Sequence, residues 1–278
     1  MSGPLPAPPH VETSSRTPLV IWGRPKKGDT LTADGPNSAY WGLQAGTYAV
    51  PRSPADFSAQ GLDLWLKAES IGIADGAVVG NWPDSSDYGG VVTWVAKNPV
   101  YRVTGGPNGG PSVDALPDGG AWQKVGNAPI TGDITCFVVF KHQLPALTQV
   151  IFGAHIAGDV ELYIANSHIH FTASVGTWEG ATIGTAPSGV WSLLLVTFRA
   201  SDSTLVIDLN GNVETFNIGG ATVFVDDGVM NVGSDLGRAG ATGNFFQGQF
   251  AELGYFRTVL TVDQLASLKA YLYNRYFG

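Results

Sequence analysis

The sequence predicts an all-β domain that ends in a single helix. The chain of 278 residues contains 37 glycines and 17 prolines but only 14% charged residues, a composition that favours short strands and many turns. Short apolar runs recur at intervals of about ten residues, with Gly, Asn, Asp and Pro between them. An Asn-Gly pair also stands between two apolar runs, which is the strongest short-range signal of a β-hairpin. Together these observations are typical of a sandwich or a barrel.

The clearest strands lie in residues 190–216. Apolar runs at 191–198, 205–209 and 213–216 are separated by 200–203 and by Asn210-Gly211-Asn212. Asn and Gly tolerate the positive φ that a tight reversal needs, so the segment predicts a three-stranded antiparallel meander. The first run is apolar at nearly every position and is expected to be buried on both faces, whereas the second alternates and places Asp208 outward.

Residues 1–57 are expected to form an irregular N-terminal arm in front of a domain at 58–278. More than half of the 17 prolines fall in this segment, and proline fixes φ and cannot donate to a β-ladder. Two apolar patches, at 19–22 and 40–43, are too large for a solvated linker. Two interpretations are open: the patches pack back on the domain, or they dock on another subunit or a partner protein. An arm of this kind suits attachment or assembly.

The remaining strands follow in order. The first is expected at 61–69, with Leu62, Leu64 and Leu66 alternating on one face. A short strand within 78–87 runs into a turn-rich loop. Further strands are expected at 91–95, 100–103, 134–141, 149–153, 160–165, 168–173, 223–225, 229–232 and 246–256.

Only the end of the chain departs from the strand pattern. Val262, Leu265, Leu268 and Leu272 recur at helical spacing, which predicts an amphipathic helix over 261–272. Thr261 stands at the N-cap position, with a carboxylate and an amide two and three residues further on.

Charge and cysteine content limit the classes of partner. The net charge is -8 and the pI is near 4.9, which argues against nucleic acid because affinity for phosphates comes from Lys and Arg. Cys136 is the only cysteine, so no intrachain disulfide can form. The first ten residues do not resemble a secretory signal, and no apolar run approaches the roughly 20 residues that cross a bilayer. We expect synthesis in the cytoplasm without a signal peptide, and no membrane partner.

Several motifs together resemble a known family. They are LDLWLKAES from Leu62, VGNWPDSSD from Val79, TCFVVFK from Thr135, the hairpin at 191–210, FFQGQFAELGYF from Phe245 and the closing TVDQLASLKAYLYNRYFG. Over about residues 60–278 they are similar to the LamG-like branch of the concanavalin A-like lectin/glucanase superfamily, of the type found in structural proteins of phage and phage-like particles. The resemblance implies a jelly roll of two antiparallel sheets, with glycan binding, where present, at the concave sheet or its rim loops.

The chain is not expected to be an enzyme. The glucanase branch of the superfamily carries two glutamates flanking an aspartate at every second position, which places three carboxylates on one face of a strand. None of the six glutamates here lies in such a pattern, and the pair Asp159 and Glu161 lacks the third member. A nucleophile-elbow serine, a zinc-ligand series and a phosphate loop are also missing from the sequence.

Aromatic residues outside the family motifs are the candidates for sugar binding, because a sugar ring packs on an aromatic face while polar groups bind its hydroxyls. Trp178, in a Gly-rich stretch, is the foremost candidate, followed by Trp94, Trp122 and the loop residue Tyr88. Three further tryptophans coincide with the motifs and are expected to be core residues: Trp65, Trp82 and Trp191.

Loop carboxylates and a pair of histidines are the candidates for metal sites. Asp226 and Asp227 with Asp235 are loop carboxylates of a type that can hold calcium, and so are Asp84 and Asp87, although turn chemistry explains both sets as well. His168 and His170 lie on one face of a strand, where they form either half of a metal site or ordinary surface residues. No cofactor other than calcium is implied.

Three functions remain open from the sequence. The first is a structural protein of a phage-like particle, in a head spike, head fibre or tail fibre, that displays a glycan-binding jelly roll for attachment to the host cell surface. In this interpretation residues 1–57 join other particle proteins, and repetition in a homo-oligomer supplies avidity on the particle exterior. The second is a structural decoration or connector protein that binds only particle subunits. The third is a polysaccharide hydrolase with an unfamiliar arrangement of carboxylates.

Overall fold

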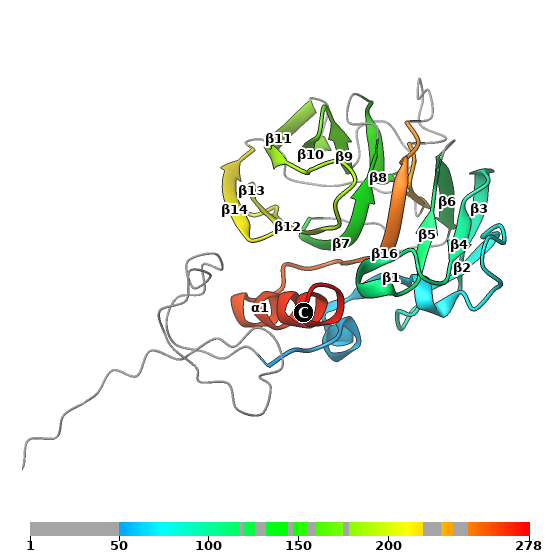
Figure 1. Cartoon of the computed structure of the whole chain (residues 1–278). Helices are drawn as coiled ribbons and strands as arrows, with labels where there is room; N and C mark the ends of the chain where they lie inside the picture. The colour runs from blue at the N-terminus through cyan, green and yellow to red at the C-terminus, as the bar shows by residue number, and fades with distance from the viewer. Residues whose placement is uncertain are drawn as a thin grey trace, which may run out of the picture. The chain divides into compact units, whose positions relative to one another are not determined.

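The computed structural model describes residues 50–116, 119–125, 132–143, 147–154, 160–174, 178–218, 229–235 and 244–278. In these ranges two antiparallel β-sheets pack on a common apolar core, and one α-helix packs on the other face of one sheet (Figure 1). The expected all-β sandwich with a C-terminal helix is confirmed. None of the helices in these ranges is long and apolar enough to cross a membrane.

Sheet A is the sheet that packs against the helix. Its strands are β1 (Leu62–Lys67), β4 (Val100–Arg102), β5 (Ser112–Asp114), β7 (Ile134–His142), β12 (Ser192–Arg199), β13 (Thr204–Leu209), β14 (Asn212–Asn217) and β16 (Gly248–Phe256). Their order is β14-β13-β12-β7-β16-β5-β4. The long strand β16 pairs with β7 along one side, and β5 and β1 share its other side.

Sheet B forms the second layer. Its strands are β2 (Asn81–Pro83), β3 (Val91–Lys97), β6 (Gly120–Val125), β8 (Gln149–Ala154), β9 (Glu161–Ala165), β10 (His168–Ser174), β11 (Trp178–Thr185) and β15 (Val229–Val232). Their order is β11-β10-β9-β8-β15-β6-β3-β2. The α-helix α1 spans Val262–Tyr276, and the short 3₁₀ helices are η1 (Pro54–Gln60), η2 (Ala68–Ser70) and η3 (Pro107–Gly109).

The predicted meander is confirmed as β12, β13 and β14, which pair antiparallel in sequence order. Asn210 and Gly211 adopt positive φ angles of 52° and 91° between β13 and β14, as a tight reversal requires. All residues of β12 except Arg199 are buried, whereas β13 alternates between buried and half-buried positions. Asp208 lies on the outward side of β13 and pairs with Lys269 of α1, with 2.5 Å between the charged atoms.

The first strand differs from the expected pattern. Leu62, Leu64 and Leu66 were expected on one face, but the register of β1 against β16 shifts between Leu62 and Leu64. Leu62 therefore packs in the apolar cluster next to α1, while Leu64 and Leu66 pack between the sheets. The prediction is wrong for Leu62 because the irregularity moves it to the opposite face.

Three strands escaped the sequence analysis, namely β5, β6 and β11. β5 has only three residues, and β6 and β11 contain glycine and polar residues that obscure the alternation. The strand expected at 223–225 lies outside the described residues.

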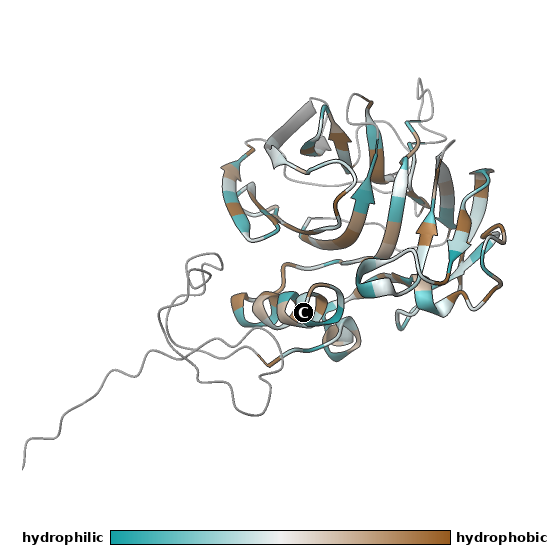
Figure 2. Ribbon diagram, in the orientation of Figure 1, coloured by the Kyte–Doolittle hydropathy of each residue, from teal (hydrophilic) through white to brown (hydrophobic). Residues whose placement is uncertain are grey.

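Two apolar clusters hold these layers together. The cluster between the sheets includes Trp82, Trp122 and Phe171. The second cluster includes Phe137 from sheet A and Leu268 from α1. Figure 2 shows apolar and hydrophilic bands alternating along several strands, as expected where one face is buried.

The C-terminal helix begins as predicted. Gln264 N donates to Thr261 Oγ1 at 3.3 Å, and Thr261 N donates to Gln264 Oε1 at 2.8 Å, which completes a capping box. Leu268 and Leu272 are buried against sheet A. Val262 was expected on the same apolar stripe but is 82% exposed, because it lies in the first turn beyond the contact with the sheet.

Residues 50–60 belong to the sandwich. The compact unit begins at Ala49, which is earlier than the boundary expected at 57/58. Pro54 and Phe57 of η1 are buried, and Phe57 is part of the cluster next to α1. Arg52 N donates a hydrogen bond to Ser267 O of α1 at 3.3 Å. The segment before β1 therefore contributes to the core.

We expect Phe57→Ala to lower the free energy of unfolding by about 3–5 kcal/mol, because it opens a cavity beneath α1. Urea denaturation of the full chain measures this change. The exposed Val50→Ala serves as the control and is expected to change stability by less than about 0.5 kcal/mol. Equal, small effects of both substitutions would place the start of the domain after Phe57.

Candidate functional site

One row of polar residues and glycines crosses the outer face of sheet B. Each member lies directly opposite the next on the neighbouring strand, in the order Asn81, Thr93, Gln123, Asn231, Gly153, Glu161, Thr172 and Gly180. The adjacent row is apolar and faces the core, with Trp122, Val232, Phe152, Leu162 and Phe171. Since neighbouring positions on a strand point to opposite faces, the polar row lies on the face turned away from sheet A.

The middle of this row is covered. Asn231 and Glu161 are buried, and Gln123 Nε2 donates to Asn231 Oδ1 at 3.2 Å. A Cβ atom at Gly153 would lie only 3.3 Å from Ser234 O, so the backbone that follows β15 passes close to the sheet here. Asn81 and Thr93 at one end of the row are exposed, whereas Thr172 near the other end is buried.

One end carries a cluster of rings and hydroxyls, which we call the His170 platform: Tyr163, His168, His170, Thr172 and Thr182. Tyr163 on β9 and Thr182 on β11 both lie opposite His170 on β10. The rings of Tyr163 and His170 stack with centroids 4.8 Å apart and an interplanar angle of 6°. Thr182 Oγ1 lies 2.8 Å from His170 Nδ1. His168 and Thr182 are exposed, and Tyr163 and His170 are half-buried.

The environment of His170 favours its neutral form. Burial lowers the pKa of its imidazole, and the nearby His168 adds to this effect, while a hydrogen bond to the Ala165 backbone opposes it. The stacked, hydrogen-bonded ring is therefore held in one orientation without a charge. A fixed ring and hydroxyl groups on rigid strands provide both packing surface and polar contacts for a small ligand.

Trp178, the foremost sugar-binding candidate, is the first residue of β11. Its backbone pairs with Ser174 of β10, two pairs along the ladder from Thr172 and Gly180. Position 178 therefore belongs to the same alternating register set as His170 and Thr182. The sequence alone does not connect Trp178 with these residues, because the connection depends on the pairing of three strands.

The other tryptophan candidates lie elsewhere. Trp122 is fully buried between the sheets and donates from Nε1 to Val79 O at 3.3 Å. The sugar-binding prediction is wrong for Trp122, because its ring has no free face. Trp94 lies opposite Trp122 on β3 and is 38% exposed. Five strands separate β3 from β11, and six spacings of about 4.8 Å place Trp94 about 29 Å along the sheet from Trp178. One sugar residue does not reach both.

The tryptophans that were expected in the core lie there in two of three cases. Trp65 and Trp82 are buried, on the helix side and between the sheets respectively. Trp191 is half-buried and packs against the helix-side cluster, with Lys141 Nζ 5.3 Å from its ring centroid.

Tyr88 lies at the rim, in the loop between β2 and β3, and is 58% exposed. Arg257 lies 4.9 Å from the centroid of its ring and donates to its hydroxyl. One face of Tyr88 is thus engaged by a guanidinium group, and no other candidate on sheet B is close in register. Tyr88 and the His170 platform are separate surfaces.

The Asp84 loop is a structural clamp between the sheets. Lys124 of β6 donates to Asp84 Oδ2 at 2.7 Å and to Asp63 O of β1 at 2.5 Å. Asp84 Oδ1 accepts from Trp65 N at 2.9 Å, and Ser86 donates to both carboxylate oxygens. These donors occupy both oxygens of the buried carboxylate. Asp84 therefore anchors β1 to sheet B and is not available as a calcium ligand.

The remaining metal candidates gain no support. Asp235 is buried, and its two carboxylate oxygens accept from Asn244 N at 2.8 Å and from Asn244 Nδ2 at 2.9 Å. Asp226 and Asp227 lie outside the described residues. Within the described ranges no group of three or more His, Cys, Asp or Glu residues could hold a metal ion.

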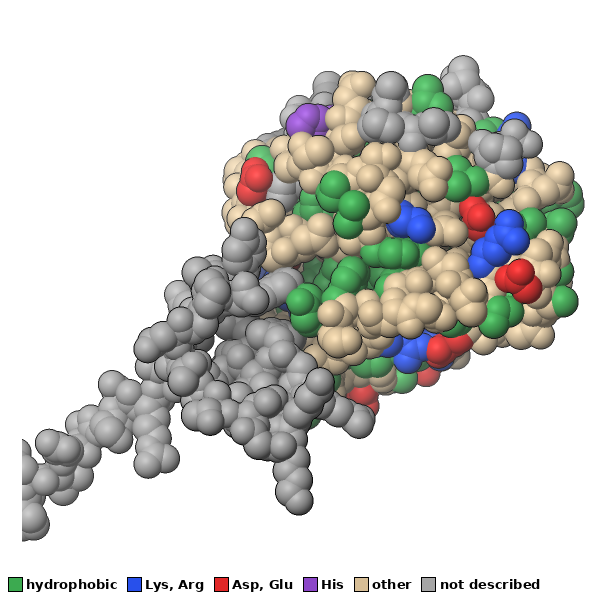
Figure 3. Space-filling view, in the orientation of Figure 1, with side chains coloured by type: hydrophobic (Ala, Val, Ile, Leu, Met, Phe, Trp, Pro, Cys, Tyr) green, Lys and Arg blue, Asp and Glu red, His purple; other side chains and the backbone are tan. Residues whose placement is uncertain are grey.

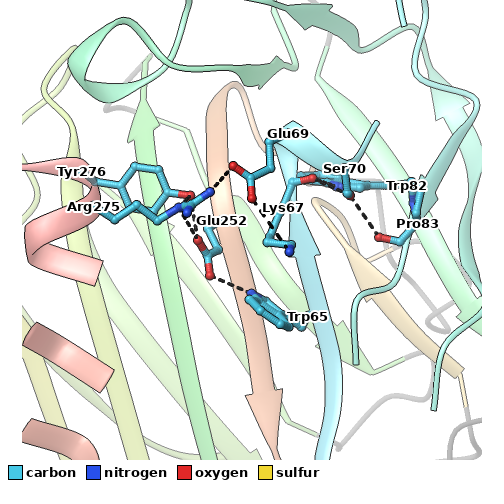
Figure 4. A network of polar contacts seen from close by, with 9 residues as sticks. All are labelled: Trp65, Lys67, Glu69, Ser70, Trp82, Pro83, Glu252, Arg275 and Tyr276. Carbon is cyan, nitrogen blue, oxygen red and sulfur yellow. Dashed lines mark hydrogen bonds and ion pairs between the residues drawn. The ribbon is translucent and has the colours of Figure 1, made fainter. Parts of the chain in front are cut away.

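A second buried carboxylate fastens the helix to sheet A (Figure 4). Trp65 Nε1 donates to Glu252 Oε1 at 2.6 Å, and Tyr276 OH donates to Oε2 at 2.7 Å. Arg275 Nε lies 3.3 Å from the same Oε2. Burial raises the pKa of Glu252 above its ordinary value, an effect that the Tyr276 and Trp65 hydrogen bonds and Arg275 oppose. These contacts lie under the helix and belong to the core.

Comparisons with known proteins place the fold but no family. No family model matches the chain, and no curated protein matches it. Among solved structures, the botulinum neurotoxin serotype D binding domain is 13% identical with a TM-score of 0.55, covering 76% of this chain and 51% of that one. The receptor binding domain of the C/D mosaic serotype is 11% identical with a TM-score of 0.52 and the same coverages.

A third similar structure is the CBM40 domain of the Ruminococcus gnavus IT-sialidase bound to α2,3-sialyllactose. It is 19% identical with a TM-score of 0.42, covering 50% of this chain and 82% of that one. The chain spans about half the length of the neurotoxin domains it matches. At these identities the likeness to the neurotoxin domains shows a shared β-sandwich fold, which confirms that part of the expected resemblance.

We expect Asp84→Ala to cost about 3–5 kcal/mol of stability, because it leaves the Lys124 ammonium buried without its partner. Lys124→Met is expected to cost a similar amount of stability, because it leaves the Asp84 carboxylate buried without its partner. The double substitution should cost less than the sum of the two, since neither charge then remains unpaired. Chemical denaturation of the four chains measures the coupling, and strictly additive losses would show that the pair does not act as a clamp.

The raised pKa of Glu252 predicts a particular pH dependence of stability. Its pKa is raised in the folded state above the ordinary 4.5, so the folded state binds the proton more readily than the unfolded state. Its contribution is greatest below the ordinary pKa and is lost as the pH rises through the raised value. Glu252→Gln is expected to flatten this fall in the free energy of unfolding.

Urea titrations from about pH 4 to about pH 8 compare the wild-type chain with Glu252→Gln. Glu69→Gln is the matched control, because Glu69 pairs with the same Arg275 but is partly exposed. A slope unchanged by Glu252→Gln would show that this carboxyl does not titrate differently in the folded and unfolded states.

Proposed function

We propose that this protein is a carbohydrate-binding module whose glycan site is the His170 platform. The observation that carries the proposal is the parallel stack of Tyr163 and His170, flanked by Thr182, on three adjacent strands of sheet B. Aromatic and imidazole rings pack against the apolar face of a sugar, and hydroxyl groups bind its hydroxyls. The platform offers both at one place, on strands rather than on loops.

Pre-organisation supports this choice of site. The Tyr163 and His170 rings fix each other, and the bond between Thr182 and His170 fixes the imidazole further. A site whose side chains are already ordered loses little conformational entropy when a ligand binds. Position 178 belongs to the same register set on β11. The proposal thus retains Trp178 and adds the five residues of the platform, which were not among the sugar-binding candidates predicted from the sequence.

The fold supports a binding role by analogy. The solved structures with TM-scores above 0.5 include domains described as the receptor binding domain of a neurotoxin, and a shared sandwich without a shared sequence indicates what the scaffold can present. We propose that the chain binds without cleaving. The two buried glutamates with described surroundings, Glu161 and Glu252, lie on different sheets and do not form an acid and nucleophile pair.

We further propose that the module works in attachment to a cell surface, as part of a head spike, head fibre or tail fibre of a phage-like particle. The support is in the sequence: the LamG-like motifs, a proline-rich segment with two apolar patches in residues 1–57, and a single cysteine. In this role the N-terminal residues join other particle proteins and a homo-oligomer supplies avidity on the exterior. A connector that binds only particle subunits is the alternative.

We expect Tyr163→Ala, His170→Ala and Trp178→Ala each to weaken glycan binding about tenfold or more, which corresponds to about 1.4 kcal/mol. Each removes a ring from the proposed site. A glycan array with the full-length chain identifies a ligand, and titration calorimetry measures the variants. We propose that no metal is needed, so a chelator should leave the affinity unchanged.

Tyr88→Ala and Trp94→Ala are the matched controls, because each removes an exposed aromatic ring from another part of the molecule. Both are expected to bind as the wild-type chain does. Loss of binding in Tyr88→Ala, with full binding in the platform variants, would move the site to the rim. Loss of glycan binding when a chelator is added would indicate a calcium site in the aspartate loops. A connector would bind none of the glycans.

A further inference from the structure

We propose that the His170 platform selects neutral glycans and rejects acidic ones that carry carboxylate or sulfate groups. This inference rests on the proposed function and narrows its ligand class. It follows from the distribution of positive charge along the chain, from the state of His170 and from the overall charge of the protein.

Positive charge is missing from this part of the sequence. No Lys or Arg occurs between His142 and Phe198, a stretch that contains β8, β9, β10 and β11 with their connections. The platform residues all come from β9, β10 and β11. In the face that Figure 3 shows, most of the visible Lys and Arg side chains lie over the middle and the right of the described surface, away from the place of β10 and β11 in Figure 1.

The described cations nearest along sheet B are directed elsewhere. Lys124 of β6 points into the clamp with Asp84 and is buried. Lys97 of β3 lies with its ammonium 5.1 Å from the ring centroid of Phe245. Both strands are separated from β9 by β15 and β8. Neither cation is placed to pair with a ligand on the platform.

Acidic sugars need such a cation. Carboxylate and sulfate groups are recognised by charge-assisted hydrogen bonds, most often from the planar fork of Arg or from Lys. Binding to a site that lacks such a cation removes water from the anion, and the new contacts do not compensate for the lost hydration. Hydroxyl groups of a neutral sugar carry no such cost, and Thr182 and Tyr163 present hydroxyl groups as partners for them.

His170 does not supply the missing positive charge near neutral pH. Its pKa is lowered by burial, and its Nδ1 is already engaged by Thr182. The carboxylate of Glu161 lies in the same row, opposite Thr172. The net charge of -8 gives the whole molecule a negative field, which repels anionic ligands and weakens with salt.

The test uses the full-length chain at about pH 8, where a histidine with an ordinary or lowered pKa is neutral. The probes are immobilised pairs that differ in charge: dextran and dextran sulfate, methyl-esterified and free polygalacturonate, and lactose and α2,3-sialyllactose. We expect measurable binding only among the neutral members and at least about tenfold weaker binding of their acidic partners. Raising the salt concentration should reduce this difference slightly, because it screens repulsion.

A gain-of-function variant makes the test independent of ligand identity. His168→Arg places a permanent cation at an exposed position of the platform, and we expect it to raise binding of the acidic probes about tenfold while His168→Gln does not. Tighter binding of an acidic probe by the wild-type chain, weakened by salt, would overturn the inference and leave the glycan site itself in place. Binding of no probe by either the wild-type chain or His168→Arg, on this panel and on the array, would overturn the proposed function as well.

Discussion

The structure depends on one constraint: the central strands of sheet A are buried on both faces. Its central strands β7, β12 and β16 are buried at nearly every position, because sheet B covers one face and α1 with η1 covers the other. Strands with two buried faces read as continuous apolar runs, which is what their sequences show. A ligand therefore does not reach the middle of this sheet, whereas His168 and Thr182 are exposed on the outer face of sheet B.

Two buried carboxylates hold the layers in place. Asp84 joins β1 to β6 through Lys124, and Glu252 joins sheet A to the end of α1 through Trp65 and Tyr276. Each is surrounded by donors, so neither is available for chemistry.

Local signals in the sequence predicted the local structure well. Asn210-Gly211 reverses the chain as expected, Thr261 caps α1, and the tryptophan of the WPDSSD loop is a core residue. Features that depend on pairing between distant strands were not predictable. Leu62 changes face because of a shift in register. Trp122 lies on β6, a strand that was not predicted, and is buried. Tyr163 lies opposite His170 only because β9 pairs with β10. The platform therefore became visible as a set only with the register in hand.

The central claim is that a glycan binds on the outer face of β9, β10 and β11. Hydrogen exchange of the full-length chain, with and without a saturating oligosaccharide, tests it without any substitution, because a bound ligand slows the local opening of the strands beneath it. The account predicts added protection in 161–174 and 178–185 and little change in 81–97 or in α1. Protection confined to the loop around Tyr88, or to the strands next to α1, would contradict it.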